Sequence, residues 1–198
     1  MKKCFFLAFL VLSLSLPIMA QGFYFDVGLG LGTGWTSIDG NDFEKELEKA
    51  GADVSSFSYN FNLKAGYGPF KRVPLFIVGS TGFFAHRIFD KNNYIEFNTY
   101  LFGAGLVLYP IKWVQLASGV GISIGVNETD MKYTTLYNTE GFGYVWDVSL
   151  AFDIGGRKHG CLLGANYITS FNTLEVTELD INSSAFAVFI KYVIRNRK

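Results

Sequence analysis

Cysteine, histidine and proline are all scarce in this sequence of 198 residues, which has two, two and four of them. Cys4 lies in the N-terminal apolar segment described below, so Cys161 is the one cysteine of the expected mature chain and an intramolecular disulfide is excluded. His86 and His159 have no second His or Cys at ligand spacing. A metal site is therefore not indicated, and we expect no cofactor.

The sequence also lacks an excess of either charge, with 17 basic and 17 acidic residues. Without Lys2 and Lys3 the balance is 15 against 17, or −2, so a nucleic-acid partner is not expected. After the first twenty residues, no stretch offers about 18 continuous apolar residues. A helical membrane protein is therefore not expected either.

The N-terminus has the pattern of an export signal. Lys2 and Lys3 precede an apolar run from Phe5 to Leu16, which ends in Pro17–Ala20. A charged start, a short apolar core and a small residue at the end are typical of a cleaved signal peptide. We expect residues 1–20 to be removed and residues 21–198 to form one domain.

A two-residue period dominates the rest of the chain. In residues 114–126 the even positions are bulky and apolar except Ser118, whereas the odd positions are small or polar. Residues 23–35 repeat the pattern, with glycine at positions 28, 30, 32 and 34 on one face. This period indicates a strand, because successive side chains point to opposite faces. A face of small residues suits the crowded interior of a narrow barrel, with the bulky face toward lipid.

The sequence predicts an all-β fold, an eight-stranded antiparallel up-and-down transmembrane β-barrel. The expected strands are residues 23–35, 57–68, 75–86, 94–109, 114–126, 142–154, 161–171 and 184–194. The facing of 75–86 stays open, because Leu75 and Ile77 oppose equally apolar Phe76 and Val78. Short and longer connections alternate, as in outer-membrane barrels with short periplasmic turns and longer surface loops.

Charges separate by side in this arrangement. Fourteen of the 17 acids lie in or beside the longer connections, and the short turns and the C-terminus carry bases. The remaining charges fall on inward positions of strands. They predict an ionic cluster in the lumen, formed by Asp26, Lys64, Asp147, Asp153 and Lys191. Such a cluster would fill the interior structurally or act as a selectivity point for permeation.

The first long connection contains a predicted short helix over residues 42–50. Phe43, Leu47 and Ala50 share one face, and Gly51 follows as a stop signal. Two interpretations stay open for this face. It packs the loop against itself, or it binds a partner.

Two other classes of protein are compatible with parts of this pattern. A barrel enzyme would use His86 near Glu96, with Ser56 or Ser58 at the same rim as nucleophile. A soluble lipocalin-like barrel would turn the bulky face inward around a ligand, but the aromatic load on that face is too large for a small cavity. We expect a protein that is not an enzyme.

From residue 23 to residue 194, the chain resembles the small eight-stranded outer-membrane barrels of the OmpX, OmpA-transmembrane and OmpW-like group. The resemblance rests on the export signal, the amphipathic strands and the asymmetric loops. The C-terminus departs from it, because Tyr192 and Ile194 are followed by Arg195, Asn196, Arg197 and Lys198 rather than by a final aromatic residue.

The resemblance implies an outer-membrane location, contact with outer-membrane lipid, and either of two roles. One is a structural or surface-interaction protein whose acidic loops touch a host or envelope partner. The other is a narrow channel for small or apolar solutes. We favour the first and expect a monomer, because inward Lys64, Asp153 and Phe189 would obstruct a water path.

Overall fold

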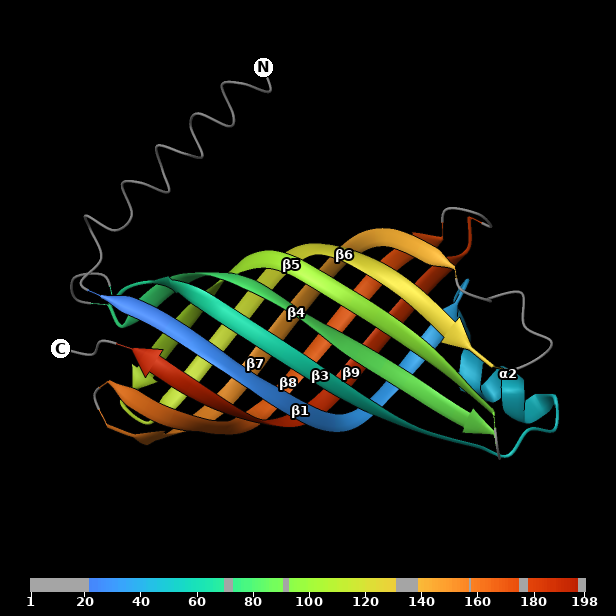
Figure 1. The fold of residues 1–198 in the computed structure, drawn as a ribbon, viewed down its shortest axis with the longest axis horizontal. Helices are drawn as coiled ribbons and strands as arrows, with labels where there is room; N and C mark the ends of the chain where they lie inside the picture. Colours follow the sequence, from blue (N-terminus) through green and yellow to red (C-terminus); the bar gives the residue numbers. More distant parts are fainter. Residues whose placement is uncertain are drawn as a thin grey trace, which may run out of the picture.

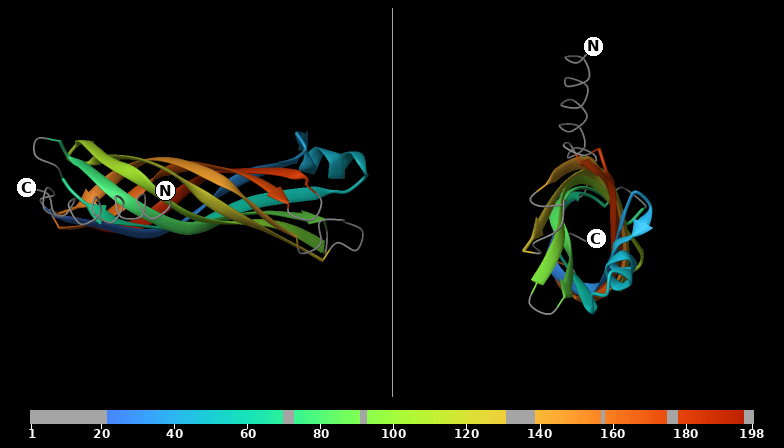
Figure 2. Two further views of the ribbon diagram at one scale, coloured as in Figure 1. Left: turned by 90° about the horizontal axis from the view of Figure 1, so that it is seen from above. Right: turned by 90° about the vertical axis from the view of Figure 1, so that its right-hand side faces the viewer.

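The structure is a computed structural model that describes residues 22–69, 73–90, 93–130, 139–156, 158–174 and 178–195. The expected signal peptide, residues 1–20, lies outside the described residues. So do Arg197 and Lys198 of the basic C-terminus and Glu175 of the last acidic connection. The described part forms one antiparallel sheet that closes on itself, as the end-on view shows (Figure 2).

Eight long strands build the barrel, and the sheet order follows the chain order (Figure 1). They are β1 (Phe23–Ile38), β3 (Val54–Tyr67), β4 (Leu75–Asp90), β5 (Asn93–Ile111), β6 (Val114–Thr129), β7 (Glu140–Gly155), β8 (His159–Leu174) and β9 (Asp180–Arg195). Pairing of β1 with β9 closes the cylinder. The predicted eight-stranded barrel is confirmed, and most strands extend a few residues beyond the predicted bounds.

The bulky faces point outward and the small-residue faces point inward. Val120 on β6 and Leu31 on β1 are 65% and 64% exposed, whereas Gly30 is buried. The predicted facing is confirmed, and the lipocalin-like alternative is wrong. A closed wall of this kind leaves a belt of exposed apolar side chains, which is stable in hydrocarbon and not in water.

The facing of β4, which the sequence left open, is settled by its side chains. Phe76, Val78 and Phe84 are buried inside the barrel, and Leu75 and Ile77 point outward. Inward apolar residues from several strands form three clusters along the lumen. The interior is therefore packed with side chains, as expected for a barrel of eight strands.

The pairing between β1 and β3 is shorter than the pairings between the other long strands. β1 pairs with β9 from Tyr24–Arg195 to Ile38–Ile181, but its pairing with β3 ends at Gly32–Ser58. After Ile38 the chain turns through Asp39 and Gly40, both at positive φ. The end of β1 then pairs with the two-residue strand β2 (Asn41–Asp42).

The helix α2 (Phe43–Lys49) follows β2 and lies at the end of the barrel opposite the start of β1 and the end of β9 (Figure 1). We call the end that carries α2 the mouth. Among the described residues, no helix is long and apolar enough to cross a membrane.

Candidate functional site

Charged side chains lie buried in the lumen near the start of β1 and the end of β3, toward the end of the barrel opposite the mouth. Lys64 Nζ lies 2.7 Å from Asp147 Oδ2, and Lys191 Nζ lies 3.7 Å from Asp26 Oδ1. Asp26 and Lys64 are also opposite each other in the β1–β3 register. The structure thus brings four of the five predicted cluster residues together as two neighbouring ion pairs.

Neutral polar groups complete this cluster. Lys191 also donates to Asn62 Oδ1 at 3.3 Å, and the Tyr24 hydroxyl donates to Asp26. Gln115 Nε2 donates to the hydroxyls of Tyr24 and Tyr109 at 2.8 and 2.9 Å. Charges in a low-dielectric interior are tolerated when hydrogen bonds of this kind satisfy them.

The fifth predicted member, Asp153, has a partner that the sequence did not indicate. Its Oδ1 lies 2.5 Å from Nη2 of Arg195, which also donates to the Gly156 carbonyl at 3.2 Å. Arg195 is buried, although the sequence placed it in a basic tail. The difference arises because β9 continues to Arg195 and its inward side chain enters the lumen beside Asp153.

Glycine makes room for these long side chains. A Cβ on Gly28 would overlap both Cγ of Lys191 and the Ile190 carbonyl oxygen. By contrast, a Cβ on the outward Gly79 would meet no atom closer than 3.9 Å, which is an ordinary van der Waals contact. The inward glycine face of β1 is therefore a steric requirement of the filled lumen.

The helix α2 packs over the mouth, where it contacts the barrel strands. Asp42 caps it, accepting a hydrogen bond from the Lys45 amide at 3.3 Å. Pairing with the Lys45 side chain lowers the pKa of Asp42 below its ordinary value. Phe43 and Leu47 are half-buried and face inward, whereas Ala50 is exposed at the end of the helix.

Phe43 and Leu47 contact an apolar cluster inside the mouth. Its buried members are Ile88, Ile95, Phe97, Leu174 and Ile181. The rings of Phe43 and Phe97 lie edge to face, with centroids 5.4 Å apart. The structure thus directs Phe43 and Leu47 toward the lumen and leaves Ala50 outside this contact, so the three do not form one outward partner-binding face.

The suggested pairing of His86 with Glu96 is wrong. His86 points into the lumen, whereas Glu96 lies on the outer face, 3.5 Å from Nε of Arg87. Adjacent positions of a strand face opposite sides, and Arg87 rather than His86 is opposite Glu96 in the register.

The true neighbours of His86 come from β1, β3 and α2. Nδ1 lies 2.9 Å from Thr36 Oγ1, and Nε2 lies 2.9 Å from Oε1 of Glu44, a residue of α2. Ser58 is opposite His86 in the register, whereas Ser56 is exposed. A side chain of the connecting loop therefore reaches His86, which a strand-by-strand pattern could not show.

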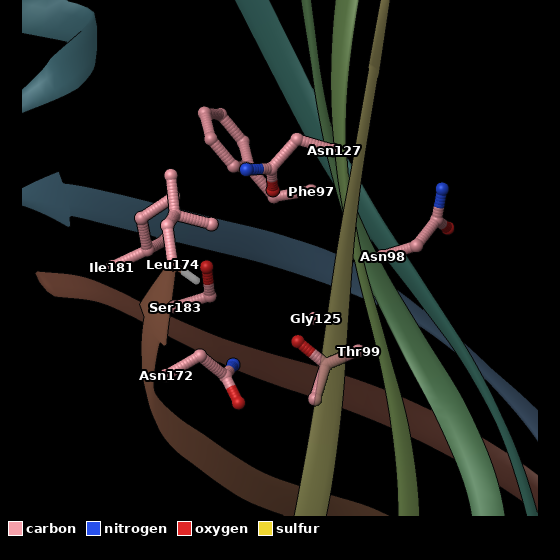
Figure 3. Close-up of a pocket in the computed structure, with 9 residues that line it drawn as sticks. All are labelled: Phe97, Asn98, Thr99, Gly125, Asn127, Asn172, Leu174, Ile181 and Ser183. Atoms are coloured by element: carbon pink, nitrogen blue, oxygen red, sulfur yellow. The ribbon is translucent and has the colours of Figure 1, made fainter. Parts of the chain in front are cut away.

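A small cavity of about 10 Å³ lies inside the mouth (Figure 3). Thr99, Asn172 and Ser183 line it with Phe97 and Leu174, while Asn98 points away from the others. This volume holds about one water molecule. Within the described ranges, no three His, Cys, Asp or Glu residues are grouped so as to hold a metal ion.

Comparison with known proteins supports the fold. No family model matches the sequence, and no curated protein matches it. Among solved structures, Ail, the attachment invasion locus protein of Yersinia pestis, is similar with a TM-score of 0.52 and 16% identity, over 85% of this chain and 98% of that one. Neisserial surface protein A is similar with a TM-score of 0.50 and 10% identity, over 85% and 95%. The chain has the fold of a small outer-membrane barrel.

Proposed function

We propose that this protein resides in the bacterial outer membrane, where a closed barrel anchors acidic loops that contact a positively charged partner at the cell surface. The exposed apolar belt and the fold shared with Ail and Neisserial surface protein A support this location. In this orientation the mouth faces outward, because longer loops lie on the outer side of such barrels.

The observation that carries a non-conducting role is the filled lumen. Three apolar clusters follow one another along it, and the ion pairs of Lys64 and Lys191 lie among them. An ion or a polar solute would have to displace packed side chains and separate buried charges to pass. We therefore favour an anchor over a channel.

Charge supports the choice of partner. The connections at the mouth and the adjoining strand ends hold 14 acidic residues in the sequence but five basic ones: Lys45, Lys49, Arg87, Lys91 and Lys132. Their balance is 5 − 14, or −9. Ail was crystallised with a heparin analogue, sucrose octasulfate, which is an anion. The mouth of this barrel has the opposite charge, so we propose a cationic partner.

Planar-bilayer recording tests the closed lumen. We expect purified protein to give no reproducible conductance steps, while a porin added to the same bilayer does. Steady steps of one size from folded protein would instead establish the narrow channel as its function.

Binding to charged surfaces tests the loops. Vesicles that carry the protein should bind immobilised polylysine but not heparin, and added salt should weaken binding. Replacing Glu46 and Glu48 with Gln should reduce it, whereas Lys158→Gln at the opposite end should not. Binding to heparin, or binding unaffected by these acids, would contradict a cationic partner.

We propose that the protein has no hydrolytic activity. Assays of lipid and ester hydrolysis on the wild type and His86→Ala check this, since activity lost on removing His86 would identify an enzyme.

A further inference from the structure

We infer that the mouth of the barrel is a binding site for a small molecule that carries a carboxylate beside an aromatic or aliphatic group, and that α2 occupies this site as an internal ligand. The mouth site consists of Thr36, Ser58 and His86 with the apolar cluster that contains Phe97. Phe43, Glu44 and Leu47 of α2 fill it in the structure.

The polar half of the site is preorganised. His86 is fully buried, and its Nδ1 is held 2.9 Å from Thr36 Oγ1, which lies 3.1 Å from Ser183 Oγ. Ser58 is also fully buried and lies directly opposite His86 on the neighbouring strand β3. Gly34 lets the two converge, because a Cβ there would overlap Ser58 Oγ and lie 2.9 Å from His86 Cδ2.

Glu44 satisfies the hydrogen-bonding groups of this polar half only in part. Its Oε1 lies 2.9 Å from His86 Nε2, yet the two atoms are not aligned as a hydrogen bond. Within the described residues, Ser58 Oγ has no hydrogen-bond partner. Buried polar groups left unpaired cost free energy, so a freely oriented carboxylate that accepts from both Nε2–H and the Ser58 hydroxyl is favoured over the tethered one.

The apolar half defines the rest of the ligand. The ring of Phe43 packs edge to face on Phe97, and Leu47 packs on the same cluster as Ile88 and Ile95. The carboxylate of Glu44 is thus presented next to an aromatic ring. Apolar walls with a few convergent polar groups are typical of small-molecule sites.

The helix is built so that it can be displaced. It has seven residues, none of which is fully buried, and isolated helices this short are marginal in water. Asp39 and Gly40 before it and Gly51 after it have positive φ, so turns lie on both sides. A ligand has to compete with few contacts to replace the side chains of α2.

Trypsin accessibility provides the first test, because the side chains of Lys45 and Lys49 on α2 are about 70% exposed. With folded protein in detergent, millimolar 3-phenylpropionate should speed cleavage after Lys45 and Lys49 several-fold. The uncharged 3-phenylpropanamide should not, and His86→Ala should abolish the effect. An equal response to acid and amide would overturn the inference, since partition into the barrel or the detergent would explain both.

A direct binding measurement gives the second test. Imidazole NMR signals of His86 should shift with 3-phenylpropionate, while those of His159, which contacts Tyr192 outside the mouth, should not. Glu44→Gln should raise the affinity for the acid several-fold because it weakens the internal competitor. Glu48→Gln on the exposed side of α2 is the matched control. Unchanged affinity in Glu44→Gln, or no His86 shift in any variant that still shows the heat-modifiable mobility of a folded barrel, would mean that α2 is a fixed cap.

Discussion

At the scale of single residues, the ion pair of Lys64 with Asp147 is shorter than that of Lys191 with Asp26. Lys64 and Asp147 are both almost completely buried, so removing one partner leaves an uncompensated charge in a low-dielectric interior. We expect Lys64→Met to cost about 3–5 kcal/mol of unfolding free energy. Urea titration of the protein in lipid vesicles measures it.

The double variant Lys64→Met with Asp147→Asn is the control for this prediction. It removes both charges, so it should be more stable than the single variant. A double variant as unstable as the sum of both single changes would show that the two side chains act independently.

Gly28 leads to a second prediction at this scale, because the space for its missing Cβ is taken by Lys191. We expect Gly28→Ala to destabilise the barrel by about 1–3 kcal/mol through overpacking. Gly79→Ala is the matched substitution on an outer face, where the added Cβ would meet no atom closer than 3.9 Å, and it should be close to neutral. Thermal unfolding followed by electrophoretic mobility compares them, and equal losses would contradict the steric argument.

At the scale of elements, α2 depends on its N-cap. Asp42→Ala should lower the stability of the helix by about 0.5–2 kcal/mol and speed tryptic cleavage after Lys45 and Lys49, without changing the unfolding of the barrel. Asp53→Ala, an exposed change after the helix, should have no such effect. Equal cleavage of both variants would show that the contacts of Phe43, Glu44 and Leu47, and not the cap, hold the helix.

The same cap responds to acid in a defined direction. Pairing with Lys45 lowers the pKa of Asp42, so its capping contribution is present at neutral pH and is lost as the pH falls below the ordinary range of a carboxyl group. Amide hydrogen exchange of Lys45, measured by NMR between pH 6 and pH 3, should become less protected only in the lowest part of this range.

The strands show which parts of the fold the sequence could predict. A strict two-residue period gave the facing of β1, β6 and β7, because lipid and lumen demand different side-chain sizes. It failed for β4, where Phe76 and Phe84 fill the lumen with the same kind of side chain that Leu75 shows to lipid. The contact of Glu44 with His86 could not be predicted, since no period relates a loop helix to the strand that it covers.

At the scale of the whole molecule, the apolar belt should define how the protein sits in the membrane. Val120→Lys places a charge in the belt and should cost about 2–4 kcal/mol of folding into vesicles. Glu128→Lys on the outward face of the same strand, near the mouth, should be tolerated. Folding yields judged from heat-modifiable mobility compare them. Similar yields for both would show that residue 120 does not face hydrocarbon.

For the ionic cluster, the sequence predicts which charges face the lumen but not which of them form pairs. Inward charges on separate strands could be recognised from parity alone, but pairing across a barrel depends on the stagger between strands. Because of this stagger, Lys64 forms an ion pair with Asp147, and Asp153 forms one with Arg195.

The short pairing between β1 and β3 has a consequence for the thermal unfolding of the barrel. β1 keeps its partner β9 as far as Ile38 but leaves β3 at Gly32, so the wall has a slit at the mouth that is covered by a helix instead of a backbone ladder. Thermal unfolding should begin at this slit, where β1 and β3 are not paired, and strand separation should then proceed toward the opposite end of the barrel. The residues flanking it, Thr33 and Phe57, would then report the first step of unfolding.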